Sequence, residues 1–182
     1  MDQRDDIHLI ELIKNPLTRD KGFMQMIDAY KRPLYWHIRR LVISHEDAED
    51  ILQETFINVY RFAGSFKGES RLYTWLYRIA TNECTKYFRK NKNWLKNAEL
   101  ITEKMLGDWS GNDNDNSDVM LIKFQQAILT LPEKQRIVFH MRYYDELSYE
   151  EISQILDSSV NTLKTNYHFA SEKIKRHLIE NA

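Results

Sequence analysis

The last third of the chain combines helix-start signals with a spacing of apolar residues that few folds accommodate. Ser148 and Glu151 form a Ser-x-x-Glu capping box, which predicts a helix beginning at Tyr149. Pro132 predicts the start of an earlier helix, because a first helical residue tolerates the missing N–H. After a polar break at residues 157–159, apolar residues recur at the period of one buried helix face; they are Leu163, Tyr167, Ala170, Ile174 and Leu178. Two helices joined by so short a break predict a helix-turn-helix.

The opposite face of the last helix carries short polar side chains. Such groups read base edges or bind phosphates when a helix enters the major groove of DNA. An ordinary three-helix bundle, with this face turned to water, is the alternative interpretation. We expect contact with duplex DNA, and the candidate residues are Asn161, Thr162, Lys164, Thr165 and His168.

Composition predicts an all-α chain of one or two small domains. The 182 residues include only 5 glycines and 3 prolines, which favours long helices over turns. No run approaches the ~20 apolar residues of a membrane span, and the acidic N-terminus lacks the apolar segment of a signal peptide. We therefore expect no membrane insertion. The single cysteine, Cys84, excludes an intramolecular disulfide, as is typical of a cytoplasmic protein.

One low-complexity stretch divides the chain. Residues 107–117 are acidic and rich in Gly, Asn and Ser, the composition of a flexible linker. We expect a helical domain over residues 1–95, a flexible acidic linker over 96–118 and a helix-turn-helix domain over 119–182. Their net charges are +3, −4 and 0. Because phosphate neutralisation dominates DNA affinity, the last domain should bind DNA weakly without another domain or a partner.

The first domain is expected to be helical throughout. Pro33 interrupts an apolar stripe and predicts a kink or a break in the helix that carries it. Ser44 is expected to cap the next helix, with Asp47 at its third position. The outward side of that helix combines acids with an isoleucine, which suits either water or a basic protein partner; its residues are Asp50, Gln53, Glu54 and Ile57.

A third helix, expected from about Arg71 to Asn91, has a polar-basic side interspersed with aromatic residues. Aromatic side chains stack on unpaired bases while Lys and Arg follow the backbone of a single strand. The alternative is that most of the aromatic residues belong to the core. Those of this helix and the loop before it are Phe66, Tyr73, Tyr77, Tyr87 and Phe88.

Together the two halves resemble one family, the extracytoplasmic function (ECF) sigma factors of bacterial RNA polymerase. The family's second region is similar to HEDAEDILQETFINVYRFAGSFKGESRLYTWLYRIATNECTKYFRK. Its fourth region is similar to LPEKQRIVFHMRYYDELSYEEISQIL followed by SVNTLKTNYHFA. The resemblance covers about residues 20–92 and 119–180, and the first of these stretches is the more specific, since many regulators contain a helix-turn-helix.

The resemblance implies a role for each surface. The motif DAEDILQETF, with Asp50, Gln53 and Glu54 and with Ile57 beside them, would dock on the clamp helices of the largest polymerase subunit. The helix-turn-helix would read the −35 promoter element, and the linker would pass through the RNA exit path. The loop and third helix would open the −10 element and hold a flipped base; the candidates are Phe66, Lys67, Arg71, Tyr73, Thr74, Arg78 and Asn82.

The chain departs from the family pattern in its helix-turn-helix. Asp157 replaces the usual turn glycine, and Asn166 and Phe169 stand where many members carry arginine. A less basic reading helix predicts an atypical −35 sequence and weak binding to DNA without polymerase. Members of the family are commonly held inactive by a membrane-linked anti-sigma factor, so the resemblance also implies such a partner.

Two other functions compete with that of a sigma factor. A free-standing helix-turn-helix regulator would bind duplex operators unaided, but the occurrence of DAEDILQETF and YTWLYRIA side by side argues against it. An enzyme would need a catalytic motif, and the chain has no P-loop, nucleophile motif or paired His/Cys spacing. We therefore expect no catalytic residue, metal, cofactor or small-molecule substrate, and a cytoplasmic protein that joins the nucleoid when active.

Overall fold

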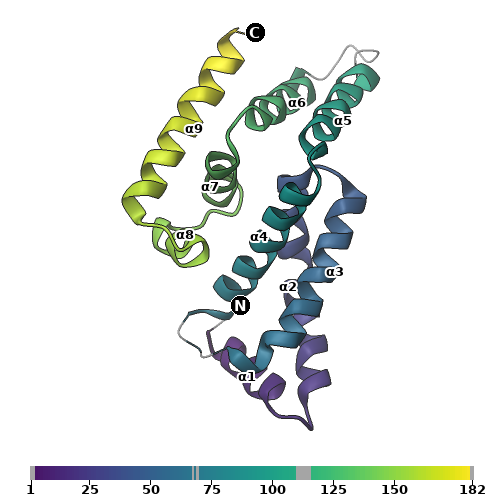
Figure 1. The fold of residues 1–182 in the computed structure, drawn as a ribbon, viewed down its shortest axis with the longest axis vertical. Coiled ribbons are helices and arrows are strands. Elements are labelled where there is room, and N and C mark those ends of the chain that lie inside the picture. Colours follow the sequence, from purple (N-terminus) through teal and green to yellow (C-terminus); the bar gives the residue numbers. More distant parts are fainter. Residues whose placement is uncertain (1–2, 67, 69, 110–115, 181–182) are drawn as a thin grey trace.

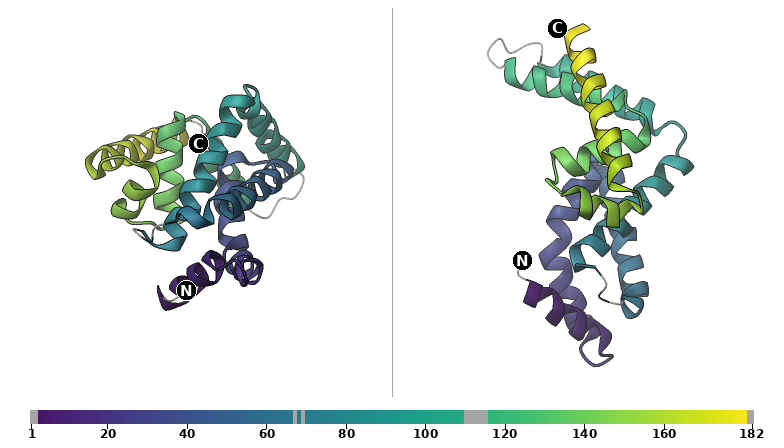
Figure 2. Two further views of the ribbon diagram at one scale, coloured as in Figure 1. Left: turned by 60° about the horizontal axis from the view of Figure 1, so that its bottom comes forward. Right: turned by 90° about the vertical axis from the view of Figure 1, so that its left-hand side faces the viewer.

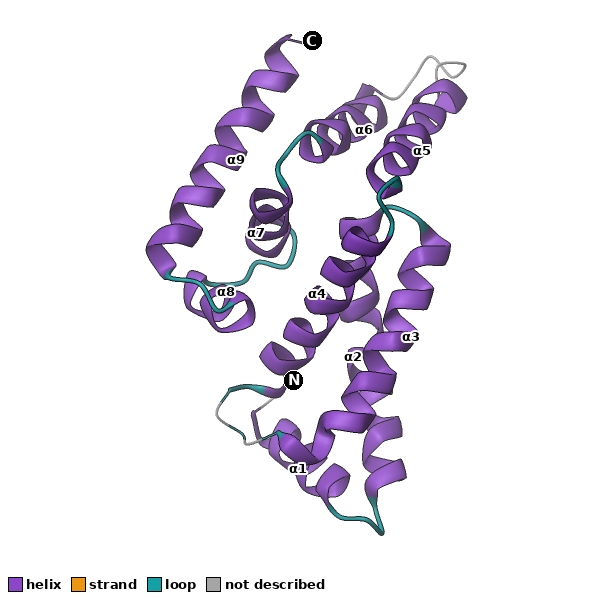
Figure 3. Ribbon diagram, in the orientation of Figure 1, coloured by secondary structure: helices purple, strands orange, loops and turns teal. Residues whose placement is uncertain are grey.

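The computed structural model describes residues 3–66, 68, 70–109 and 116–180, and within these ranges it is all-α with no strand (Figures 1 and 3). The elements are α1 (Gln3–Lys14), α2 (Arg19–Val42), α3 (His45–Phe62), the short 3-10 helix η1 (Ala63–Ser65), α4 (Leu72–Lys90), α5 (Trp94–Trp109), α6 (Asn116–Leu129), α7 (Glu133–Tyr143), α8 (Tyr149–Leu156) and α9 (Val160–Glu180). None of the described helices is long and apolar enough to cross a bilayer.

Local signals in the sequence place several of the helix starts. The Ser44 hydroxyl accepts a 3.3 Å hydrogen bond from the Asp47 backbone N–H and caps α3. The Ser148–Glu151 capping box forms in full, so α8 begins at Tyr149 as predicted. Pro132 instead occupies the N-cap, and α7 begins one residue later than predicted.

Helix α2 continues through Pro33, so the predicted alternative of a break is wrong. Its buried side chains on both sides of the proline hold the helix in the first bundle, and tertiary packing outweighs the missing backbone hydrogen bond. Helix α1 crosses α2 where Gly22 lies against Leu12 and Ile13, and a Cβ on Gly22 would come within 2.6 Å of the Leu12 Cβ. This close approach joins α1 to the bundle of α2, α3 and α4 (Figure 2).

The C-terminal half forms a second bundle, in which α9 packs against α6, α7 and α8. Its own core contains Ala127, Ile128, Leu131, Phe139, Ala170 and Ile174. Helix α8 ends at Leu156, and its C-cap, Asp157, takes up the left-handed conformation with φ 50° and ψ 52°. The position where the family pattern favours glycine therefore has a backbone that suits glycine, and Asp is among the few other residues that tolerate it.

The expected flexible linker is wrong over much of its length, because α5 extends from Trp94 to Trp109 and α6 begins at Asn116. Trp94, Ala98 and Thr102 are buried at helical spacing, and α5 packs beside α6. An apolar face of this kind stabilises a helix even in an acidic segment. Residues 110–115, the centre of the predicted linker, lie outside the described residues.

The two halves are in contact rather than separate. Helix α7 packs on α2, and α8 packs on α4 (Figures 1 and 2). The larger hydrophobic core is continuous across this boundary and includes Leu34 and Leu76 from the first half with Met141 and Ile152 from the second.

Candidate functional site

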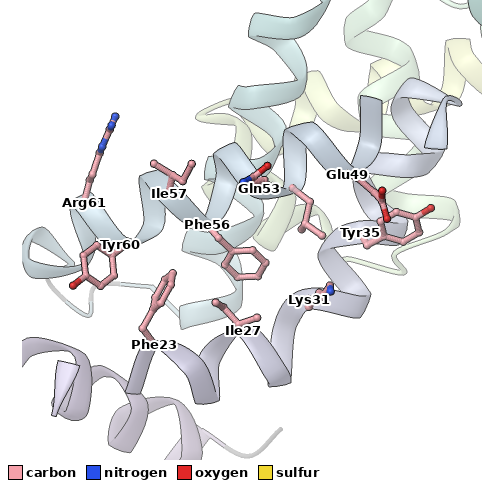
Figure 4. A pocket seen from close by; sticks show the side chains of 11 residues that line it. Phe23, Ile27, Lys31, Tyr35, Glu49, Gln53, Phe56, Ile57, Tyr60 and Arg61 are labelled. Atoms are coloured by element: carbon pink, nitrogen blue, oxygen red, sulfur yellow. The ribbon is translucent and has the colours of Figure 1, made fainter. Parts of the chain in front are cut away.

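An apolar groove of about 600 Å³ opens between α2 and α3. Phe23 and Ile27 from α2 and Phe56 and Tyr60 from α3 point toward one another along it (Figure 4). The rings of Phe23 and Tyr60 meet edge to face with centroids 5.0 Å apart. An open apolar groove rimmed by polar groups is typical of a surface that receives a partner.

The acidic patch predicted on α3 borders this groove. Gln53 and Ile57 line it, and Asp50 and Glu54 are exposed on the same helix. Ile57 is 37% exposed, so the predicted outward isoleucine is confirmed as a surface residue. The groove itself was not predicted, because the apolar stripe that contains Phe23 and Ile27 indicated only one apolar face of a helix. The spacing of aromatic residues on α2 and α3 was the available signal.

The residues expected to contact a single strand divide into a surface set and an interior set. Arg71, Arg78 and Asn82 are exposed along α4, and Tyr73 is half-buried. Phe66 and Thr74 are buried. Lys67 lies outside the described residues. Of the described candidates, four are therefore accessible, and Phe66 and Thr74 are not.

Phe66 and Thr74 have structural positions that explain their burial. The Phe66 ring packs on Trp75 with centroids 5.1 Å apart, and so ties the loop to α4. Thr74 is 1% exposed on the side of α4 that faces away from water. In this conformation neither side chain is accessible to a strand of DNA.

A second, more polar pocket of about 350 Å³ lies between α3 and α4. Asn82 lines it together with Lys86, Arg89 and the exposed ring of Phe62. Lys86 is held by a 2.7 Å ion pair to Glu83. The pocket thus adds two cations, Lys86 and Arg89, to the polar-basic side of α4, and neither was among the predicted site residues.

All five residues predicted to read duplex DNA are exposed on the first turns of α9, and they are Asn161, Thr162, Lys164, Thr165 and His168. Two of their hydroxyls are already engaged within the helix. Thr162 shares a 2.8 Å hydrogen bond with the Ser159 hydroxyl, and Thr165 donates to the Asn161 carbonyl at 2.9 Å. Hydrogen bonding outward is therefore left chiefly to Asn161, Lys164 and His168.

Tyr149, the first residue of α8, packs beside the reading face, the surface formed by the five exposed residues of α9. Its ring lies 5.8 Å from the Lys164 ammonium and 5.3 Å from the Arg142 guanidinium, distances at which a cation is attracted to an aromatic face. Tyr149 was not singled out by sequence reasoning, because its position as N1 of α8 identified only a helix start. It places one cation of the reading face against the preceding helix.

The described residues contain no group of three or more His, Cys, Asp or Glu side chains arranged to hold a metal ion. Cys84 is fully buried within α4, and burial raises the pKa of its thiol far above the ordinary value. A thiol in this state is a poor nucleophile.

Two family models match the chain. Sigma-70 region 2 matches residues 26–93, which include α3, α4 and the lining of the groove apart from Phe23, and Sigma-70, region 4 matches residues 121–174, which include the helix-turn-helix. Among curated proteins, the ECF RNA polymerase sigma factor SigW of Bacillus subtilis is 37% identical over 166 residues, covering 86% of this chain and 89% of the relative. The ECF RNA polymerase sigma-E factor of Haemophilus influenzae is 32% identical and covers 96% of this chain and 95% of the relative.

Solved structures share the fold. CnrH in complex with the cytosolic domain of CnrY matches with a TM-score of 0.71 at 17% identity, over 100% of this chain and 99% of that one. The sigma factor RpoE in complex with the anti-sigma factor NepR from Bartonella quintana matches with a TM-score of 0.66 at 23% identity, over 87% of this chain and 97% of that one.

Proposed function

The chain belongs to the ECF sigma factors of bacterial RNA polymerase, and on that premise we propose how its surfaces direct promoter-specific initiation. It binds core polymerase, recognises −10 and −35 elements and helps to open the DNA. The observation that carries this proposal is the presence, in one chain, of a region 2 with a partner-sized groove and a region 4 with an exposed reading helix.

The polymerase-docking surface is the rim of the α2–α3 groove. Asp50, Gln53, Glu54 and Ile57 present acids and an apolar side chain beside it. A helical partner with basic residues, such as the clamp helices of the largest subunit, would insert apolar side chains into the groove and pair its cations with Asp50 and Glu54.

The −10 surface is the polar-basic side of α4. Arg71, Tyr73, Arg78 and Asn82 carry it, and Lys86 and Arg89 extend it past the second pocket. Basic side chains along a helix follow the phosphates, and a polar pocket between α3 and α4 has room for an unstacked base.

The −35 surface is the start of α9. Asn161, Lys164 and His168 offer hydrogen bonds to base edges or phosphates, and Thr162 and Thr165 contribute shape beside them. The chain supplies no catalysis of its own, because polymerase performs nucleotidyl transfer. It acts in the bacterial cytoplasm and associates with the nucleoid when bound to promoters.

An anti-sigma factor is a further expected partner. The two structural neighbours were solved as complexes, one of them with a named anti-sigma factor, and they share this fold over most of the chain. A protein of that kind would compete with core polymerase for the groove. A free-standing regulator remains the weaker alternative, because it leaves the region 2 surfaces without a use.

Run-off transcription on a promoter library, with core polymerase and with or without the chain, tests the function. Transcripts that require the chain are expected, and their upstream sequences define the two elements. Glu54→Arg should abolish these transcripts and lower the affinity for core about tenfold or more, because it sets a cation against a basic partner. Lys164→Ala should reduce only those transcripts that depend on the −35 element.

Glu11→Arg is the matched control for docking, since Glu11 is an equally exposed acid on α1 away from the groove. It should transcribe like the wild type. Duplex binding by the free chain with no chain-dependent transcripts would instead favour the free-standing regulator. Full core affinity in Glu54→Arg would remove this residue from the docking surface.

A further inference from the structure

Phe169 places an aromatic ring beside the polar side chains that form the reading face of α9. It is 50% exposed, and the His168 ring lies next to it with centroids 5.8 Å apart. Single apolar residues are common on protein surfaces, so exposure alone assigns no function to Phe169. Its position on α9 decides what the ring can contact.

Helical spacing puts the Phe169 ring on the outward side of α9. Phe169 follows Thr165 by four residues and Asn161 by eight, and residues four apart lie on the same face of a helix. Leu163 and Ala170 are buried on the opposite side. At a rise of 1.5 Å per residue, Phe169 lies about 12 Å beyond Asn161 along the axis, the length of about three or four stacked base pairs. Both side chains can therefore contact one promoter element.

The major groove offers one apolar group to such a ring. The base edges present hydrogen-bond donors and acceptors there, and the C5-methyl group of thymine is the hydrocarbon group among them. A phenyl ring pressed against a polar edge would remove its water without replacing the hydrogen bonds, which is unfavourable. Contact with a thymine methyl instead buries apolar surface on both partners.

The residue type at position 169 also excludes the contacts that a cation would make. Arginine, which many members of the family carry at this position, binds guanine through two hydrogen bonds or pairs with a phosphate. Phe169 does neither, and Lys164 is the one cation of the reading face. At this position of α9, apolar contact therefore takes the place of charge.

We propose that Phe169 is a specificity-determining residue of the −35 surface and contacts the C5-methyl group of a thymine. The contact selects thymine at one position of the element, next to the groups that Asn161 and Lys164 bind. This rests on the proposed function of α9 as the −35 reading helix. Thr162 and Thr165 are the competing side chains, because a threonine methyl also contacts thymine.

Replacement of thymine by deoxyuridine tests the contact in the polymerase holoenzyme. Deoxyuridine pairs with adenine as thymine does and lacks only the C5-methyl group. Each thymine of the −35 element found in the run-off transcripts is replaced singly in a fluorescein-labelled duplex. The duplex ends upstream of the −10 element, so that strand opening does not contribute to the anisotropy. One replacement should weaken binding about fourfold, the effect expected for the burial of a single methyl group.

Phe169→Ala completes a double-mutant cycle with the same duplexes. The variant should bind the thymine duplex at least about fourfold more weakly than the wild type. It should also be insensitive to deoxyuridine, because the two changes remove one shared contact. Far-UV circular dichroism establishes that the variant keeps its helices.

Ile179→Ala is the matched control for the cycle. Ile179 is a 67% exposed apolar residue about three turns farther along the same helix. This variant should bind like the wild type and keep the full sensitivity to deoxyuridine.

Phe169→Arg tests whether residue 169 faces a base or a phosphate. Arginine facing a base should prefer guanine, so the variant should bind a duplex with guanine in place of the sensitive thymine more tightly than the thymine duplex. Equal strengthening with both duplexes, together with a steeper salt dependence, would place residue 169 at the backbone and overturn the proposal.

The remaining outcomes separate the role of Phe169 from the function of the chain. Deoxyuridine sensitivity that persists in Phe169→Ala would assign the methyl contact to another side chain, such as Thr165, and would overturn the proposal. A wild-type holoenzyme that needs the −35 element but tolerates every replacement would overturn it too, and would leave the sigma-factor function intact. A chain that directs no transcription from any promoter would overturn both.

Discussion

At the scale of single residues, His140 is the side chain whose burial has the clearest consequence for stability. It is 1% exposed, and neither ring nitrogen has a hydrogen-bond partner among the described residues. Its ring stacks on Tyr144 at 5.3 Å. Burial is the largest cause that lowers its pKa well below the ordinary value, followed by the charges of Arg136, His37 and Arg40. The folded protein therefore holds His140 in its neutral form.

The free energy of unfolding should decrease as the pH is lowered below the ordinary pKa of a histidine. An unfolded His binds a proton below about pH 6.5 and the folded one does not, so the stabilisation is complete above that pH and is lost below it. Between pH 6.5 and 5.5 the wild type should lose about 1 kcal/mol more free energy of unfolding than His140→Phe. Urea unfolding at the two pH values measures this difference. Exposed His168→Gln should behave as the wild type, and identical pH dependence in His140→Phe would contradict the assignment.

At the scale of the elements, the crossing of α1 and α2 depends on a residue without a side chain. Gly22 allows the backbone of Ile13 and the Cβ of Leu12 to approach α2 closely. The buried hydrogen bond from the Tyr30 hydroxyl to Asp6, at 2.5 Å, then joins the two helices farther along. Helix α1 lies outside the region 2 match at residues 26–93, so this contact attaches an element that the family model does not include.

Gly22→Ala should destabilise the protein, although alanine favours helix formation by about 1 kcal/mol. The new Cβ would meet Leu12 at 2.6 Å, and overpacking of this kind costs about 1–3 kcal/mol. Faster hydrogen exchange in α1 is expected, together with a small net loss in the free energy of unfolding. Gly64→Ala is the control, because a Cβ there meets nothing within 4 Å. Unaltered hydrogen exchange in α1 would show that the crossing of α1 and α2 tolerates a Cβ at residue 22, and would contradict this prediction.

At the scale of the whole molecule, charge limits what the free chain does with DNA. The formal net charge is −1, and the helix-turn-helix domain over residues 119–182 is neutral. The reading face combines one lysine with uncharged side chains, and two of its hydroxyls are engaged internally. Few phosphates are neutralised by such a surface, so most of the promoter affinity must come from polymerase.

The free chain should bind a duplex with its own −35 element no more tightly than about 1 µM at physiological salt, the range of non-specific binding. Fluorescence anisotropy at low and moderate salt measures this affinity and its salt dependence. The same duplex within the polymerase holoenzyme should bind far more tightly. Nanomolar binding by the free chain would restore the free-standing regulator as the better description.

Local chemistry made much of this structure predictable. Ser44 and Ser148 are followed at the right distance by their capping partners, and the apolar period of α9 separates a buried face from the exposed Asn161 and Lys164. Such signals lie within a few residues of one another, so the sequence contains them directly. Burial of Phe66 and Thr74 was not predictable in this way, because it depends on how a loop and a helix pack together.

Contacts between distant parts of the chain were the main omission. His37 and Asp145 are 108 positions apart, and no short-range pattern links them. The helix over Trp94–Trp109 was missed for a related reason, since acidic and Gly/Asn-rich composition indicated a linker while the apolar spacing at Trp94, Ala98 and Thr102 received no weight. The α2–α3 groove arises from the angle between two helices, which single-helix patterns do not specify.

The contact of α7 and α8 with the first bundle can form only late in the synthesis of the chain. The N-terminal bundle is complete once α4 has left the ribosome, but the helices that cover His37 and Arg78 are encoded in the last third of the chain. At bacterial elongation rates of about 5–20 residues per second, the remaining 92 residues after Lys90 require several seconds. Every nascent chain therefore passes through a stage in which α7 and α8 do not yet pack against the first bundle. Polymerase or an inhibitor that binds the nascent chain would therefore meet α4 before α8 packs on it.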